Sequence, residues 1–117
     1  MGRAAERDLL ERLDGAVRTM GESLAEAAGD EAQKHAVLRD VFRVNHEMGR
    51  IAREFPSMGP ALRDLQMEVN FVTIQVKRAG FDQAREGFAR VVASLERVRS
   101  TNTGDSPGES PGLRKNL

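Results

Sequence analysis

The sequence contains no cysteine, no tryptophan and no tyrosine. A chain without cysteine has no disulfide, no thiol nucleophile, no cysteine-ligated zinc site and no thioether-linked haem. Its five phenylalanines are the only aromatic residues, and we expect all of them in the core. The exposed aromatic rings on which single-stranded nucleic acids stack are therefore not expected.

The chain also lacks an excess of either charge, because 18 lysines and arginines match 18 aspartates and glutamates. This balance argues against broad binding to nucleic acids or anionic membranes. No apolar run approaches the length of a membrane span, and the N-terminal segment lacks the apolar core of a signal peptide. We therefore expect a single-domain cytoplasmic protein that acts neither on membranes nor on nucleic acids.

What the sequence does contain is helical spacing of apolar residues in four segments. Within each segment these residues alternate steps of three and four, which places them on one stripe of a helix. The stripes are Leu10, Leu13, Val17, Met20, Leu24 and Ala27; Val37, Val41, Val44, Met48, Ile51 and Phe55; Leu62, Leu65, Val69, Val72, Val76 and Ala79; and Phe81, Ala84, Phe88, Val91, Leu95 and Val98. They predict helices over 4–28, 31–54, 59–79 and 82–100.

Glycine and proline mark the breaks between the predicted helices. Pro60 suits the first turn of the third helix, and Gly80 precedes Asp82, which can cap the fourth. The connections are short, so consecutive helices should run antiparallel. The sequence therefore predicts an all-α, antiparallel four-helix bundle over residues 1–100. Residues 101–117 are rich in Ser, Gly and Pro and are expected to form a disordered tail or linker.

The third segment carries a second apolar stripe. Residues 67–76 are rich in β-branched side chains, which also suit a strand, but a lone strand would have nothing to pair with. We therefore expect a helix with a broad apolar face, on which Met67, Phe71 and Ile74 lie beside the core stripe. This helix is either the most buried of the four, or it presents these side chains to a protein partner.

The second segment has a basic face beside its core stripe. Its members follow at alternating steps of four and three: Arg39, Arg43, His46, Arg50 and Arg53. Four guanidinium groups around a histidine favour an anion or an acidic partner bound beside it, or a phosphate carried on it. The alternative is a solvated face whose arginines pair with Asp40, Glu47 and Glu54.

The residues around this histidine resemble a known motif. The resemblance covers the stretch Val41-Phe42-Arg43-Val44-Asn45-His46-Glu47-Met48-Gly49-Arg50. It looks like the helix that carries the phosphorylated histidine in histidine phosphotransfer domains, especially those of chemotaxis kinases, where Phe-Arg-x-x-His precedes a hydrophobic residue, Lys and Gly. The resemblance implies His46 as phospho-acceptor, Glu68 on the next helix as the carboxylate that orients it, and a receiver domain as partner.

This motif departs from the family pattern after the histidine. The family's Lys-Gly pair is Gly49-Arg50 here, in reversed order, and the later family glycine is Pro56. Arg50 lies one turn from His46 and can supply the charge that binds a phosphate. The resemblance thus implies a degenerate motif, in an active or an inactive member.

A second resemblance concerns the fourth segment. It is similar to the last helix of c-prime-type cytochromes in the run Gly80-Phe81-Asp82-Gln83-Ala84, through Phe88, to Leu95-Glu96-Arg97-Val98-Arg99. The family's Cys-x-x-Cys-His falls on Leu95, Val98 and Arg99. This resemblance therefore implies a shared bundle without haem.

Common catalytic signatures are missing, since the sequence has no phosphate-binding loop, no dinucleotide turn, no His-Glu-x-x-His and no nucleophile elbow. We expect a non-enzymatic adaptor or regulatory bundle, without metal or cofactor, that binds a protein or self-associates. The alternative function is histidine phosphotransfer through His46. A third, a ligand-holding bundle, predicts an internal pocket lined by Met20, Met48 and Met67, which otherwise serve as core residues that fill gaps.

Overall fold

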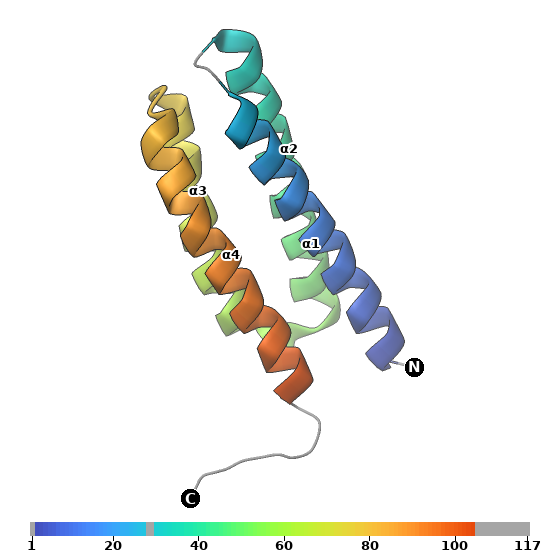
Figure 1. The fold of residues 1–117 in the computed structure, drawn as a ribbon. Helices are drawn as coiled ribbons and strands as arrows, with labels where there is room; N and C mark the ends of the chain where they lie inside the picture. Colours follow the sequence, from blue (N-terminus) through green and yellow to red (C-terminus); the bar gives the residue numbers. More distant parts are fainter. Residues whose placement is uncertain (1, 28–29, 105–117) are drawn as a thin grey trace, which may run out of the picture.

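The fold consists of four long helices, drawn in Figure 1. The computed structural model describes residues 2–27 and 30–104. The helices are α1 (Gly2–Glu26), α2 (Glu31–Glu54), α3 (Gly59–Lys77) and α4 (Phe81–Gly104), and a short 3-10 helix, η1 (Pro56–Met58), joins α2 to α3. The described residues include no strand, so the predicted all-α class is confirmed and the β-branched third segment is a helix.

The helices form two hairpins that pack against each other. Successive helices run in opposite directions, so the N-terminal end of α1 and the C-terminal end of α4 lie at the same end of the molecule (Figure 1). Helix α1 packs along α2 and α3 packs along α4, while the α2–α3 and α1–α4 contacts join the two hairpins. Within the described ranges the diagonal pairs, α1 with α3 and α2 with α4, have no Cα atoms within 8 Å of each other, so each helix has two close neighbours, as in an up-down-up-down bundle.

The predicted stripes meet in the centre and form the core. All their members are buried, with three exceptions: Phe55, Phe88 and Ala79. Phe55 and Phe88 are partly buried and pack against the core. The prediction for Ala79 was wrong, because Ala79 is exposed in the turn between α3 and α4. Its φ of 60° is left-handed, and the Gly80 N–H donates to the carbonyl of Gln75 at 2.7 Å, which ends the helix earlier than predicted.

Local hydrogen bonds define where the helices begin. Asp30 caps α2, because its Oδ1 accepts a hydrogen bond from the Gln33 backbone N–H at 2.8 Å. Helix α4 begins at Phe81 rather than at residue 82, so Asp82 lies inside the first turn. There its carboxylate pairs with Arg85 at 2.7 Å.

The fourth helix is longer than the sequence indicated. It runs to Gly104, past the predicted end of the bundle at residue 100, because nothing in residues 101–104 breaks the helix before the glycine. The remainder of the predicted disordered tail, residues 105–117, lies outside the described residues. No helix in the described part of the chain combines the length and apolar character that a membrane span requires.

Candidate functional site

The basic stripe forms the outer side of α2, away from the core. His46 is exposed there together with three of the arginines, and Arg50 is partly buried. Among the described residues, none of the four arginines makes an ion pair. Of the three carboxylates expected to pair with them, Asp40 accepts a hydrogen bond from Ser23 at 2.5 Å, Glu47 is buried and Glu54 is exposed, and none forms an ion pair within the described residues. We call the set of Arg39, Arg43, His46, Arg50 and Arg53 the arginine stripe.

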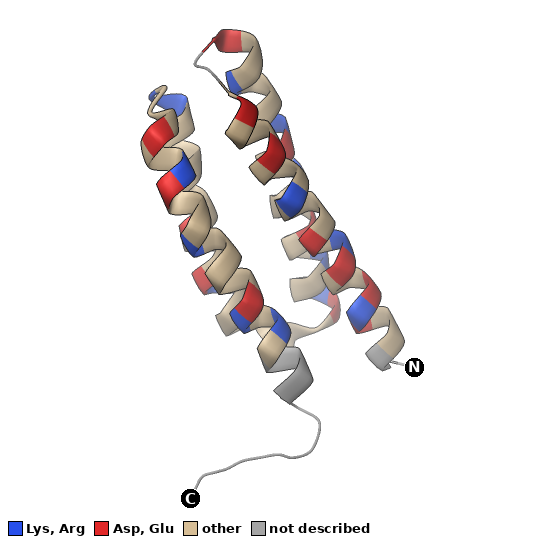
Figure 2. Ribbon diagram, in the orientation of Figure 1, with Lys and Arg blue, Asp and Glu red and all other residues tan. Residues whose placement is uncertain are grey.

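This absence of pairing is local and does not reflect a lack of acidic residues. Figure 2 shows that acidic and basic residues are distributed along all four helices. Other arginines do find carboxylates, for example Arg90 with Glu68 at 3.2 Å and Arg99 with Asp14 at 3.1 Å. The arginine stripe is therefore a row of guanidinium groups available to an external anion.

Phe42 is exposed, contrary to its predicted place in the core. We predicted a core position, but 74% of its surface is exposed, the largest value among the exposed large apolar residues. Phe42 follows the core residue Val41 and is therefore turned by about 100° from the core stripe. Its spacing of four residues from His46 was the available signal, because that spacing places both side chains on the same outer side of α2.

His46 and Glu68 lie on different sides of the bundle. The carboxylate of Glu68 accepts a hydrogen bond from Nε of Arg90 at 3.2 Å, so Glu68 faces α4 rather than α2. In the described part of the chain, His46 makes no hydrogen bond to Glu68 or to another carboxylate. The pairing implied by the phosphotransfer resemblance is thus not formed, since position 68 falls on the α4 side of α3.

The three members of the second apolar stripe of α3 differ in how exposed they are. Met67 is 63% exposed and Ile74 is 47% exposed, so both side chains face outward. Phe71 is partly buried, because its ring packs against Gly87 of α4 and the guanidinium of Arg90 lies 5.0 Å from the ring centroid. Of the three residues predicted to form a partner-binding surface, Met67 and Ile74 are the two that are largely open.

A polar ladder connects the exposed apolar residues of α2 and α3. The side-chain amide of Gln66 donates to Oδ1 of Asn45 and to Oδ1 of Asn70, both at 3.0 Å. Asn45 lies one turn from Phe42, and Asn70 lies one turn from both Met67 and Ile74. The three exposed side chains therefore lie on one side of the bundle, with the ladder between them. The ladder also supplies the hydrogen-bond partner that a residue beside the core, such as Asn45, requires.

The methionines do not form a ligand set. Met20 and Met48 are buried in the core, whereas Met67 is exposed on the outer side of α3. The described residues also contain no group of three or more histidine, aspartate or glutamate side chains arranged to hold a metal.

No protein-family model, curated protein or solved structure matches this chain. Several exposed side chains on α2 and α3 distinguish this chain. The most distinctive of these are Phe42, Met67 and Ile74 together with the arginine stripe, and we call this combination the α2–α3 face.

Proposed function

We propose that this protein is a non-enzymatic interaction module that binds an acidic protein partner through the α2–α3 face. One observation carries the proposal: a phenylalanine that is 74% exposed lies among four arginines that make no ion pair with the described residues. Exposed apolar groups and unpaired charges are each common on protein surfaces. Their combination on one side of a helix is what favours a partner-binding surface.

The residue types support this interpretation. Aromatic residues, methionine and arginine are enriched in protein–protein interfaces, whereas lysine, glutamate and aspartate are depleted. Phe42, Met67 and Ile74 can supply apolar anchors, and the guanidinium groups can form charge-assisted, bidentate hydrogen bonds to carboxylates. Complementary charge also accelerates encounter and rejects basic competitors.

The chemistry of the partner follows from this arrangement. It should present apolar side chains to the surface between α2 and α3, with aspartate or glutamate at the edge that meets the arginine stripe. An amphipathic acidic helix satisfies both requirements, because residues three and four apart share one face. A second copy of this chain is a less suitable partner, since a self-complementary contact would bring the two arginine stripes close together.

The test is quantitative affinity capture from cells of the source organism, with matched baits. The disruptive baits are Phe42→Ser and the double variant Arg39→Glu, Arg43→Glu. The control bait is the double variant Arg7→Glu, Arg78→Glu, which makes the same change of charge at exposed positions on α1 and in the α3–α4 turn. We expect a partner that is retained by the wild type and the control and lost from both disruptive baits.

Two results would contradict the proposal. The first is an identical set of captured proteins for the wild type and for Phe42→Ser. The second is concentration-dependent self-association in sedimentation experiments that the Phe42→Ser substitution abolishes, because this would assign the α2–α3 face to a second copy. Circular dichroism of each bait checks that the helices are intact, as expected for exposed positions.

A further inference from the structure

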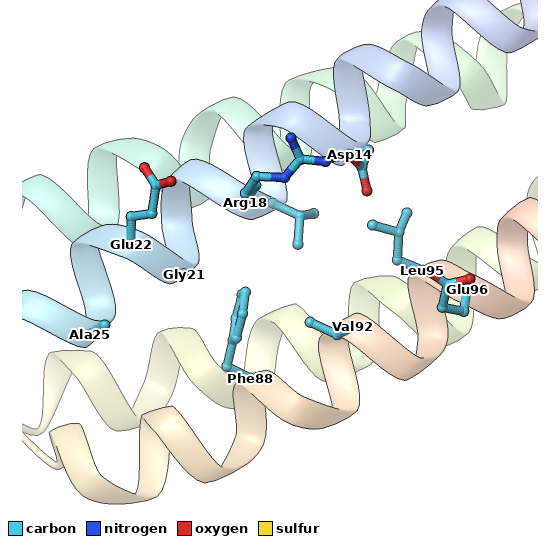
Figure 3. A pocket seen from close by; sticks show the side chains of 10 residues that line it. Asp14, Arg18, Gly21, Glu22, Ala25, Phe88, Val92, Leu95 and Glu96 are labelled. Carbon is cyan, nitrogen blue, oxygen red and sulfur yellow. Dashed lines mark hydrogen bonds and ion pairs between the residues drawn. The ribbon is translucent and has the colours of Figure 1, made fainter.

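A groove between α1 and α4 provides a second candidate site, independent of the α2–α3 face. Its volume is about 350 Å³ and its floor is apolar, formed by Val17, Phe88, Val92 and Leu95. Figure 3 shows Phe88 projecting from α4 toward Gly21 of α1. A Cβ atom on Gly21 would lie 2.5 Å from the ring, so the glycine is what lets the ring extend across the groove.

The charges at the rim of this groove are not balanced. Asp14 is neutralised, because it pairs with Arg18 and with Arg99. The other two acidic residues that line the groove are Glu22 and Glu96, and neither forms an ion pair within the described residues. The groove therefore combines an apolar floor with two unpaired carboxylates, which fits an occupant that has both apolar and cationic side chains.

The chain itself carries a segment of this composition. Beyond Gly104, all the large apolar residues and all the basic residues occur in the last five positions, Leu113-Arg114-Lys115-Asn116-Leu117. Two leucines match the apolar floor, and one arginine and one lysine match the two unpaired carboxylates.

The connection between this segment and the groove is long enough. Gly104, the last residue of α4, is about 18 Å from Val92 along the helix axis. The chain from Gly104 to Leu113 can span up to about 30 Å when extended. It can therefore turn back along α4 and bring Leu113 to the level of Val92.

We propose that residues 113–117 bind in the α1–α4 groove of the same molecule. Leu113 and Leu117 contact the floor around Phe88 and Val92, and the basic pair contacts Glu22 and Glu96. Because a short tether joins the segment to α4, its effective concentration at the groove is on the order of millimolar, and even a weak contact is substantially populated. Docking of the tail covers the apolar groove when no other molecule occupies it.

The experiment uses the whole 117-residue chain, which contains no cysteine. The substitution Asn116→Cys creates a unique attachment point for a nitroxide spin label beside the basic pair. In ¹⁵N-labelled protein we expect the label to reduce the amide signals of Gly21 and Val92. The signal of Ile74, which faces outward on α3, should be retained.

A charge exchange separates docking from random contact. In the labelled chain, Arg114→Glu with Lys115→Glu should restore the Gly21 and Val92 signals. Adding Glu22→Lys and Glu96→Lys to that variant should reduce them again, because the pairs are re-formed with opposite signs. High salt should also restore the signals, since the Debye length falls to about 3 Å at 1 M.

The proposal is overturned if Gly21 and Val92 keep their full signals in the labelled wild-type sequence, or if the loss persists unchanged after charge reversal of the tail. A control mixture tests whether the segment binds within its own molecule. It combines ¹⁴N protein that carries the spin label with ¹⁵N protein that carries no spin label. Signal loss in that mixture equal to the loss within one chain would place the tail of a second copy in the groove and contradict intramolecular binding. None of these results depends on the α2–α3 face.

Discussion

The ring of Phe71 on α3 lies directly over Gly87 on α4. A Cβ atom on Gly87 would be 2.8 Å from Cδ2 of the ring and 3.3 Å from a methyl group of Val72. Gly87 is buried, and the guanidinium of Arg90 covers the ring from the same helix. The close approach of α3 and α4 therefore depends on the missing side chain at position 87.

The substitution Gly87→Ala should lower the free energy of unfolding by about 1–3 kcal/mol, because the added methyl group pushes the Phe71 ring and the Val72 side chain away from α4. The matched control is Gly15→Ala on α1, where no atom lies within 4 Å of the added Cβ. That change should raise stability by about 0.5–1 kcal/mol through helix propensity alone. Urea unfolding measures both, and a stabilised Gly87→Ala protein would show that the helices do not pack this closely.

The sequence predicts some levels of this structure better than others. The number of helices, the order of the elements and nearly all of the core follow from apolar spacing, because each helix must bury one stripe. Contacts between particular helices do not follow in the same way. The packing of Phe71 on Gly87, or of Phe88 on Gly21, joins a large and a small residue on different helices, and no periodicity within one helix specifies which pairs will meet.

In the candidate site, too, positions along one helix were predicted better than contacts between helices. The arginine stripe was predicted correctly as a separate outer stripe, since its members share a helix. Glu68 was assigned to His46 by distance along the chain, but the rotation of α3 about its own axis turns Glu68 toward Arg90. Phe42 was assigned to the core from its apolar character, although its angular position on α2 places it outside.

Arg85 holds the end of α1 against α4. Its Nη1 donates to the carbonyl oxygens of Leu24 at 3.1 Å and Ala27 at 3.2 Å, at the C-terminal end of α1, where the last carbonyls lack the usual intrahelical donors four residues on. We expect Arg85→Met to lower the free energy of unfolding by about 1 kcal/mol, because the carbonyls and the helix dipole lose a cation. Arg78→Met, at an exposed position in the α3–α4 turn, should change it by less than about 0.5 kcal/mol. Equal effects of the two substitutions in urea unfolding would contradict this role.

Glu47 is a buried carboxylate with an unsatisfied oxygen. It is only 9% exposed, and its Oε1 has no hydrogen-bond partner in the structure. Replacement by methionine, which has a similar length and helix propensity, removes a desolvated polar group and should raise the free energy of unfolding by about 1 kcal/mol. Glu54→Met, at an exposed position of α2, is the matched control and should change it by less than about 0.5 kcal/mol.

A destabilised Glu47→Met protein would mean that this carboxylate does have a partner in solution. Arg12 and Arg43 are the two cationic side chains that line the same hollow as Glu47. Adding Arg12→Met or Arg43→Met to Glu47→Met would then identify the partner. Loss of the partner arginine should change the free energy of unfolding little once the carboxylate is gone.

The resemblance to histidine phosphotransfer domains predicts that His46 is phosphorylated. If His46 accepts a phosphoryl group from a phosphorylated receiver domain or a histidine kinase, the product is an acid-labile phosphohistidine. The His46→Gln protein should then take up no phosphoryl group. This substitution is at an exposed position and should change the free energy of unfolding by less than about 0.5 kcal/mol.

The role of Glu68 gives the decisive comparison. In the family the carboxylate on the next helix orients the histidine, so its loss should slow transfer. Here Glu68 pairs with Arg90, and Glu68→Gln should leave the rate of any transfer to His46 unchanged. Arg50→Gln should slow it, because Arg50 lies one turn from His46 and can hold the incoming phosphate. A rate that falls with Glu68→Gln and not with Arg50→Gln would show that α3 turns Glu68 toward His46 in solution.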